Sequence, residues 1–154
     1  MQLTENFKQE EFERDGCAMP DKEVVAAYRT LCSELLEPIR ASFREPLYVT
    51  SGYRSLEVNQ RIGGAPGSQH IATGNQAAAD FYLESHRAHG QALFDWIRMS
   101  QLPFDQVILE HGKYGDIIHI SWSDKKRRQA LEGATFNQSV YQARYVAPSI
   151  VEET

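Results

Sequence analysis

The stretch Ser68–Phe81, SQHIATGNQAAADF, places His70 and Asp80 on either side of a polar, glycine-containing turn and a run of alanines. Residues 79–83 read as a strand, and period-two alternation puts Asp80 on the face opposite its apolar neighbours. Two interpretations follow. His70 and Asp80 are either two ligands of one metal ion or a surface histidine and a loop carboxylate that lie close together in the sequence.

A second strand, IHISW over residues 118–122, bears on this choice. Its isoleucines and Trp122 share one face, which we expect to be the core face, so His119 points to the open face. If both strands belong to one sheet, His119 and Asp80 meet, and His70 comes from the preceding loop. Two imidazoles and one carboxylate are the ligand set of a catalytic zinc site with a fourth position for water. The alternative for His119 is a hydrogen-bonded, half-buried strand residue.

Two further residues have the chemistry of an active site. Asp116 lies three positions before His119 and would face away from it in a regular strand. It serves as a general base only if it sits at the turn beside Gly115, and otherwise it stabilises that turn. Arg54 ends the β-rich run LYVTSGYR and is either a clamp for a substrate carboxylate or a surface arginine.

Length and charge limit the classes of protein. A chain of 154 residues with 42% hydrophobic and 24% charged residues is typical of one soluble domain. The net charge of −5 argues against a nucleic-acid partner. The basic run over residues 125–128 is interpreted as a solvated helix start, with contact to an anionic polymer as the alternative.

No segment approaches the ~20 apolar residues of a membrane span, so no stable membrane association is expected. The polar start lacks a secretory pattern, which predicts synthesis in the cytoplasm. Monomer is the default state.

The order of elements predicts an α+β fold. A helix is expected after the capping residue Asp21, with further helices over residues 55–62 and 88–101. Strands are expected over 47–53, 79–83, 106–110 and 117–122, the last two joined by a turn at 112–115. This pattern favours a mostly antiparallel sheet with helices on one side and the zinc site on its open face. Residues after Gly133 remain unassigned.

Four motifs in this order resemble one family: SGYRS (51–55), SQH (68–70), AADF (78–81) and D-x-x-HIS (116–121). They are similar to the zinc D-alanyl-D-alanine carboxypeptidases and murein endopeptidases, which have the hedgehog/DD-peptidase fold and include many phage or prophage lysis enzymes. The resemblance covers roughly residues 4–132 of a single peptidase-like domain over 1–154. Residues 133–154 are expected to form a C-terminal tail.

The resemblance implies a role for each motif. The Zn²⁺ ligands would be His70, Asp80 and His119. Asp116 would be the general base, Arg54 would bind substrate and stabilise the developing oxyanion, and Ser68 and Gln69 would help hold the substrate. The substrate would be a peptidoglycan stem peptide, cut by a carboxypeptidase or endopeptidase that reaches the cell wall after release. The alternative is a non-catalytic structural or binding relative, such as a virion component with phage virion proteins as partners.

One departure from the family pattern falls on the opening stretch. The pattern His-x-x-Gly-x-Ala-x-Asp has six residues between the ligands, whereas nine separate His70 from Asp80 here. The insertion either bulges out and leaves the site intact or marks a scaffold that has lost its metal. Because every ligand type survives, together with Asp116 and Arg54, the intact site is favoured.

Overall fold

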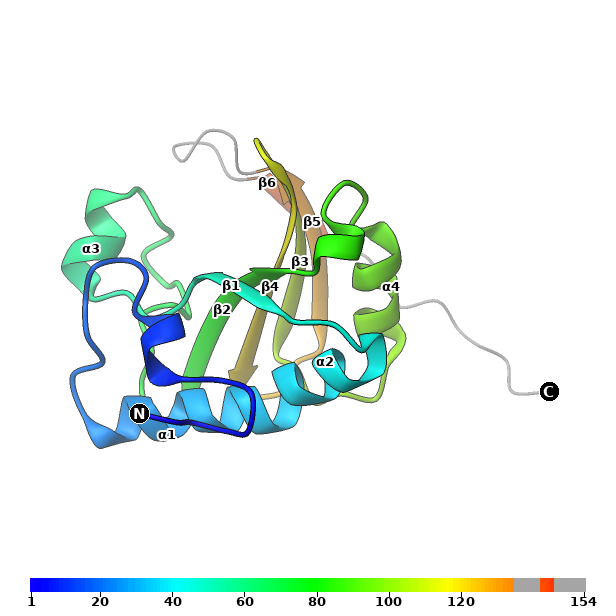
Figure 1. The fold of residues 1–154 in the computed structure, drawn as a ribbon. Helices are drawn as coiled ribbons and strands as arrows, with labels where there is room; N and C mark the ends of the chain where they lie inside the picture. The colour runs from blue at the N-terminus through cyan, green and yellow to red at the C-terminus, as the bar shows by residue number, and fades with distance from the viewer. Residues whose placement is uncertain (135–141, 146–154) are drawn as a thin grey trace.

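The computed structural model describes residues 1–134 and 142–145, and its centre is a six-stranded sheet in the order β1-β2-β4-β3-β5-β6 (Figure 1). The strands are β1 (Tyr48–Ser51), β2 (Gln76–Tyr82), β3 (Gln106–Gly112), β4 (Gly115–Ser123), β5 (Gln129–Ala134) and β6 (Gln142–Tyr145). Neighbouring strands are antiparallel except β3 and β5, which are parallel. The prediction of an α+β fold with a mostly antiparallel sheet is confirmed.

The helices gather mainly on one face of this sheet. They are α1 (Lys22–Leu31), α2 (Glu37–Phe43), α3 (Leu56–Arg61) and α4 (Gln91–Met99), with a π-helical segment, Cys32–Leu36, joining α1 to α2. Two short 3₁₀ helices, η1 (Gln9–Phe12) and η3 (Glu84–His86), complete the set. Asp21 caps α1 as expected, because its Oδ1 accepts a hydrogen bond of 2.9 Å from the Val24 amide. Figure 1 shows α1 and α2 running along one side of the sheet, away from α3.

One hydrophobic core lies between the sheet and helices α1, α2 and α4. On β2 and β4 the residues that face it alternate with those of the open face: Ala79 and Phe81 are buried on either side of Asp80, and Ile118 and Ile120 on either side of His119. The core therefore holds the sheet so that the opposite face is free for polar side chains. Among the described residues, no helix is both long and apolar enough to cross a membrane.

The insertion before Asp80 is absorbed by a turn and by a longer strand. Strand β2 begins at Gln76 instead of Ala79, and Thr73 pairs with Gln76 in an isolated bridge that closes the turn before it. Closing a few extra residues costs little because loop entropy grows slowly with length. With the additional residues taken up in this way, Asp80 on β2 pairs directly with His119 on β4.

The basic run over residues 125–128 does not begin a helix, so that interpretation is wrong. It is a turn that leads into β5, a strand that the sequence analysis missed. Buried partners impose this path: the Arg127 amide and guanidinium donate hydrogen bonds to Asp105, and the Arg128 guanidinium donates to the Ser100 carbonyl at the end of α4. These tertiary contacts outweigh a local pattern of charge.

Candidate metal centre

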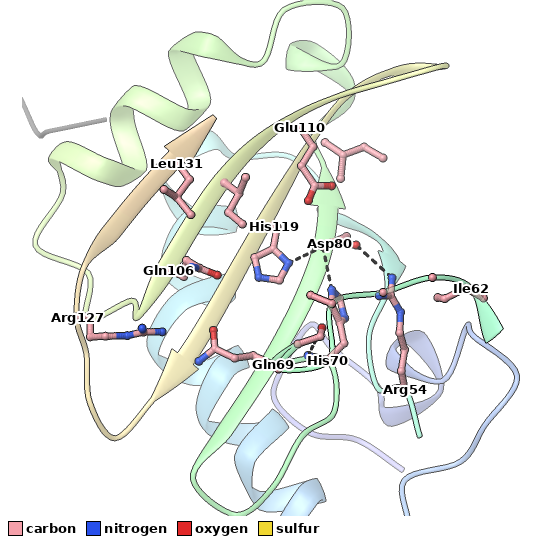
Figure 2. A pocket seen from close by; sticks show the side chains of 17 residues that line it. Arg54, Ile62, Gln69, His70, Asp80, Gln106, Glu110, His119, Arg127 and Leu131 are labelled. Atoms are coloured by element: carbon pink, nitrogen blue, oxygen red, sulfur yellow. Dashed lines mark hydrogen bonds and ion pairs between the residues drawn. The ribbon is translucent and has the colours of Figure 1, made fainter. Parts of the chain in front are cut away.

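Three side chains from separate segments meet on the open face of the sheet (Figure 2). Asp80 on β2 and His119 on β4 are direct cross-strand partners, and His70 lies in the loop before β2. Asp80 Oδ1 is 3.0 Å from His119 Nδ1 and 3.2 Å from His70 Nε2. One ligand atom from each residue lies within 4.8 Å of the others. The predicted trio is therefore brought together, despite the insertion between His70 and Asp80.

The hydrogen bonds of His70 show that this trio fits a cation. His70 Nδ1 lies 2.6 Å from the carbonyl oxygen of Gly52, which only accepts, so Nδ1 carries a hydrogen. In the neutral ring, Nε2 then presents a lone pair to Asp80 Oδ1, which is also an acceptor. Two facing acceptors are reconciled by a positive charge between them, either a proton on Nε2 or a metal ion that both atoms bind. A histidine whose second nitrogen donates to a backbone carbonyl is the usual arrangement of a zinc ligand.

Burial and neighbouring charges set the protonation states that a metal needs. Burial lowers the pKa of His119, which favours the neutral ring that binds metals. Burial opposes ionisation of Asp80, but the charges and hydrogen bonds of His70 and His119 outweigh it and hold the pKa of Asp80 well below its usual range. The set therefore offers one carboxylate and at least one neutral imidazole, the donor types of a catalytic zinc site.

Arg54 is held beside this trio by an acidic and a hydroxyl group. Its Nε lies 3.3 Å from Asp15 Oδ2, and its Nη2 lies 3.0 Å from Ser51 Oγ. The Ser51 hydroxyl itself donates to Asp15 at 2.6 Å. Nη2 is also 3.8 Å from Asp80 Oδ2, so the guanidinium borders the metal site. Sequence reasoning placed Arg54 here but did not identify Asp15, because residues 39 positions apart in sequence carry no local signal.

A cavity of about 640 Å³ opens above the trio. Its lining residues include Arg54, Ser68, Gln69, Glu110, Arg127 and Leu131. Fully buried Asp105 organises one side: its carboxylate accepts hydrogen bonds from Gln69 Nε2 at 2.7 Å and from Arg127 Nη2 at 2.8 Å. Burial opposes its ionisation, but the hydrogen bonds from Arg127 and Gln69 prevail and lower the pKa of Asp105. Ser68 and Gln69 line this cavity, and their contact with substrate stays a prediction.

The structure does not bring Asp116 into this cavity. Its Oδ1 lies 2.8 Å from His111 Nδ1, and its Oδ2 accepts a hydrogen bond of 2.6 Å from the Gly90 amide at the start of α4. The Asp116 side chain therefore connects the β3–β4 hairpin to α4. Its assignment as general base stays a prediction that this position does not favour.

Sequence reasoning missed Glu110, which lines the cavity from β3. Burial and the nearby charge of Asp80 raise the pKa of Glu110 well above its usual value. Alternation along Gln106–Gly112 contained a signal, since it places the carboxylate on the face opposite Val107 and Leu109. Alternation alone does not place Glu110 near the metal trio, because that also requires knowing that β3 pairs with β4.

Gly52 joins the metal site to the N-terminal segment and allows a sharp test. A Cβ at Gly52 would lie 2.4 Å from the Phe12 carbonyl oxygen, whereas a Cβ at Gly67 would have no heavy atom within 4 Å. We expect Gly52→Ala to reduce the free energy of unfolding by about 1–3 kcal/mol, the usual cost of overpacking. Gly67→Ala is the control and should stay near wild type. Equal stabilities in denaturant titrations would contradict this packing.

Comparison with known proteins comes from a family model. The model described as Peptidase M15 matches residues 3–121 of the chain. The match spans all three residues of the metal trio and ends before β5, so Arg127 and Leu131 on the cavity wall lie outside it. No curated protein matches the chain.

Proposed function

The chain belongs to the peptidase M15 family, a family of zinc-dependent metallopeptidases, and from this premise we propose that it hydrolyses peptide bonds in peptidoglycan stem peptides. It would act as a D,D-carboxypeptidase or a murein endopeptidase, in a phage- or prophage-derived lysis enzyme. The observation that carries this proposal is the convergence of His70, Asp80 and His119 at the floor of an open cavity.

Zinc held by these three residues would polarise a scissile carbonyl and lower the pKa of a water molecule. The residues of the chain would hold these zinc ligands in position. His70 is fixed in position by the Gly52 carbonyl, and His119 is fixed by its register against Asp80 on the neighbouring strand. A site that is held on strands in this way keeps its ligands in place with little reorganisation.

Arg54 supplies a positive charge for the oxygen that becomes negative as the carbonyl is attacked. Its Nε and Nη2 are occupied by Asp15 and Ser51, which orients the guanidinium and leaves its other N–H groups to reach the cavity. Prearranged donors of this kind stabilise a tetrahedral intermediate without reorganisation. Arg54 therefore serves both substrate binding and stabilisation of the oxyanion.

Groups for binding an extended peptide lie along the cavity wall. Gln69 Nε2 is occupied by Asp105, whereas Gln69 Oε1 is buried and has no hydrogen-bond partner within residues 1–134. Ser68 and Arg127 line the same cavity. A peptide offers both amide donors and carboxylate acceptors to such groups. The chain would be made in the cytoplasm and act on the wall after release, whereas the alternative is a virion component that binds wall without cleaving it.

Digestion of purified murein tests this proposal. We expect the zinc-loaded protein to release free D-alanine if it is a carboxypeptidase, or to convert cross-linked stem peptides to monomers if it is an endopeptidase, as read by mass spectrometry. Treatment with a chelator should stop the reaction, and added zinc should restore it. Zinc-loaded protein that sediments with murein but leaves its peptides intact would contradict the proposal and support the non-catalytic alternative.

A further inference from the structure

Both carboxylate oxygens of Asp116 are already engaged on the helix-covered side of the sheet. Asp116 lies on the same face of β4 as the buried Ile118 and Ile120, and it pairs with His111 across the hairpin. Gly90 packs so closely against it that a Cβ there would lie 2.8 Å from Asp116 Cβ. Reaching the metal trio would require Asp116 to cross to the other face of its strand. A reactive water on the open face is therefore out of its reach.

Glu110 occupies the corresponding place on the open face. In the β3–β4 register, Ile108 pairs with His119 and Glu110 pairs with Ile117. Glu110 and His119 are therefore diagonal neighbours on one face, a separation of about 7–8 Å that long side chains bridge. Figure 2 shows the Glu110 carboxylate directed toward Asp80 and His119 inside the cavity.

The second observation is that no described residue forms a hydrogen bond with the Glu110 carboxylate. Within residues 1–134 it forms no hydrogen bond or ion pair, although other acidic side chains around the cavity, Asp80 and Asp105, are each held by several. Glu110 is partly exposed and lines the cavity, so its carboxylate is open to a water molecule or a substrate there. A carboxylate that no neighbouring donor occupies is free to accept a proton.

We propose that Glu110, rather than Asp116, is the catalytic residue that moves the proton during peptide hydrolysis, an inference that rests on the peptidase function proposed above. The Glu110 carboxylate takes a proton from water as the water oxygen bonds to the scissile carbonyl carbon. The C–N bond then breaks, the nitrogen leaves with the electron pair, and Glu110 returns the proton to it. One water is consumed, and the products are a carboxylic acid and an amine.

Paired variants separate the two carboxylates. We expect Glu110→Gln to lower kcat for stem-peptide cleavage by about 10²–10⁴-fold, the usual contribution of a proton-transfer residue. Its zinc content should stay at one per chain, because Glu110 is not a ligand. Glu110→Asp, which keeps the carboxylate but shortens its reach, should fall between wild type and Glu110→Gln. Asp116→Asn should retain at least a tenth of the wild-type kcat.

Thermal unfolding of the zinc-free proteins provides a readout independent of activity. Glu110→Gln removes a carboxyl group that has no hydrogen-bond partner within residues 1–134 and should leave Tm unchanged or raise it by about 2–4 °C. Asp116→Asn weakens the contacts with His111 and Gly90 and should lower Tm by about 2–4 °C. If wild type cleaves no stem peptide, the proposed function fails, and these Tm shifts still report which carboxylate is structural.

Two results would overturn the assignment of Glu110. One is a Glu110→Gln variant that keeps zinc and at least a tenth of the wild-type kcat. The other is a Glu110→Gln variant whose Tm falls by several degrees or whose zinc is lost, since that would make Glu110 a structural residue or a ligand. Loss of activity in Asp116→Asn with zinc and Tm unchanged would return the role to Asp116.

Discussion

Asp80→Asn should lose zinc and lose peptidase activity together. Asp80 Oδ1 is the atom that both His70 Nε2 and His119 Nδ1 face, and an amide provides neither the charge nor the second equivalent oxygen. Mutating a residue that hydrogen-bonds to a zinc ligand weakens zinc affinity by about 10–100-fold, so loss of the ligand itself should weaken it by more than about 100-fold. Activity should fall by more than about 10³-fold, because zinc supplies several kcal/mol of stabilisation and each 1.4 kcal/mol is worth a factor of ten.

Asp124→Asn is the matched control for this change. Asp124 is an exposed aspartate just beyond the end of β4 and lies outside the cavity lining. We expect it to bind zinc and cleave peptides as wild type does, with metal content measured by elemental analysis after dialysis. An Asp80→Asn protein that retains one tightly bound zinc would contradict the assignment of Asp80 as a ligand.

Arg54→Met should reduce kcat by about 10²–10³-fold, the effect of removing one donor to an oxyanion. Methionine keeps much of the aliphatic bulk but removes the charge. Zinc content should be unchanged, because Arg54 reaches the site only through a 3.8 Å contact with Asp80. Steady-state kinetics on a defined stem peptide, together with elemental analysis, measure both quantities.

Arg61→Met controls for the loss of a positive charge near the cavity. Arg61 lies on α3, and its side chain is 68% exposed and paired only weakly with Glu57. Kinetics like those of wild type are expected. An Arg54→Met variant with a raised KM and an unchanged kcat would show that Arg54 only binds the substrate. That result would contradict its assignment as a group that stabilises the oxyanion.

The metal trio was predictable because strand alternation carries strong information about faces. His119 and Asp80 each sit between buried apolar neighbours, so each had to face the open side of its strand. The order of motifs then supplied the pairing of the two strands. The intact site was favoured from the sequence because the ligand types survive, but the strand was expected to begin at residue 79, whereas β2 begins at Gln76.

The remaining features depend on contacts between distant segments. Residues 125–128 read locally as a charged helix start, but the buried carboxylate of Asp105 draws Arg127 into a turn and allows the parallel strand β5. In the same way, Asp116 matched the spacing expected of a base, yet its partners His111 and Gly90 come from β3 and the start of α4. Spacing alone does not reveal such partners.

Anomalous scattering at the zinc edge, from crystals of the wild-type protein, is the most direct test of the metal centre. One strong peak is predicted, about 2.0–2.1 Å from His70 Nε2 and His119 Nδ1 and about 2.0–2.2 Å from an Asp80 oxygen. Absence of a peak from zinc-soaked crystals, or a peak only elsewhere on the molecule, would contradict the claim that these three residues form the zinc site of a peptidase.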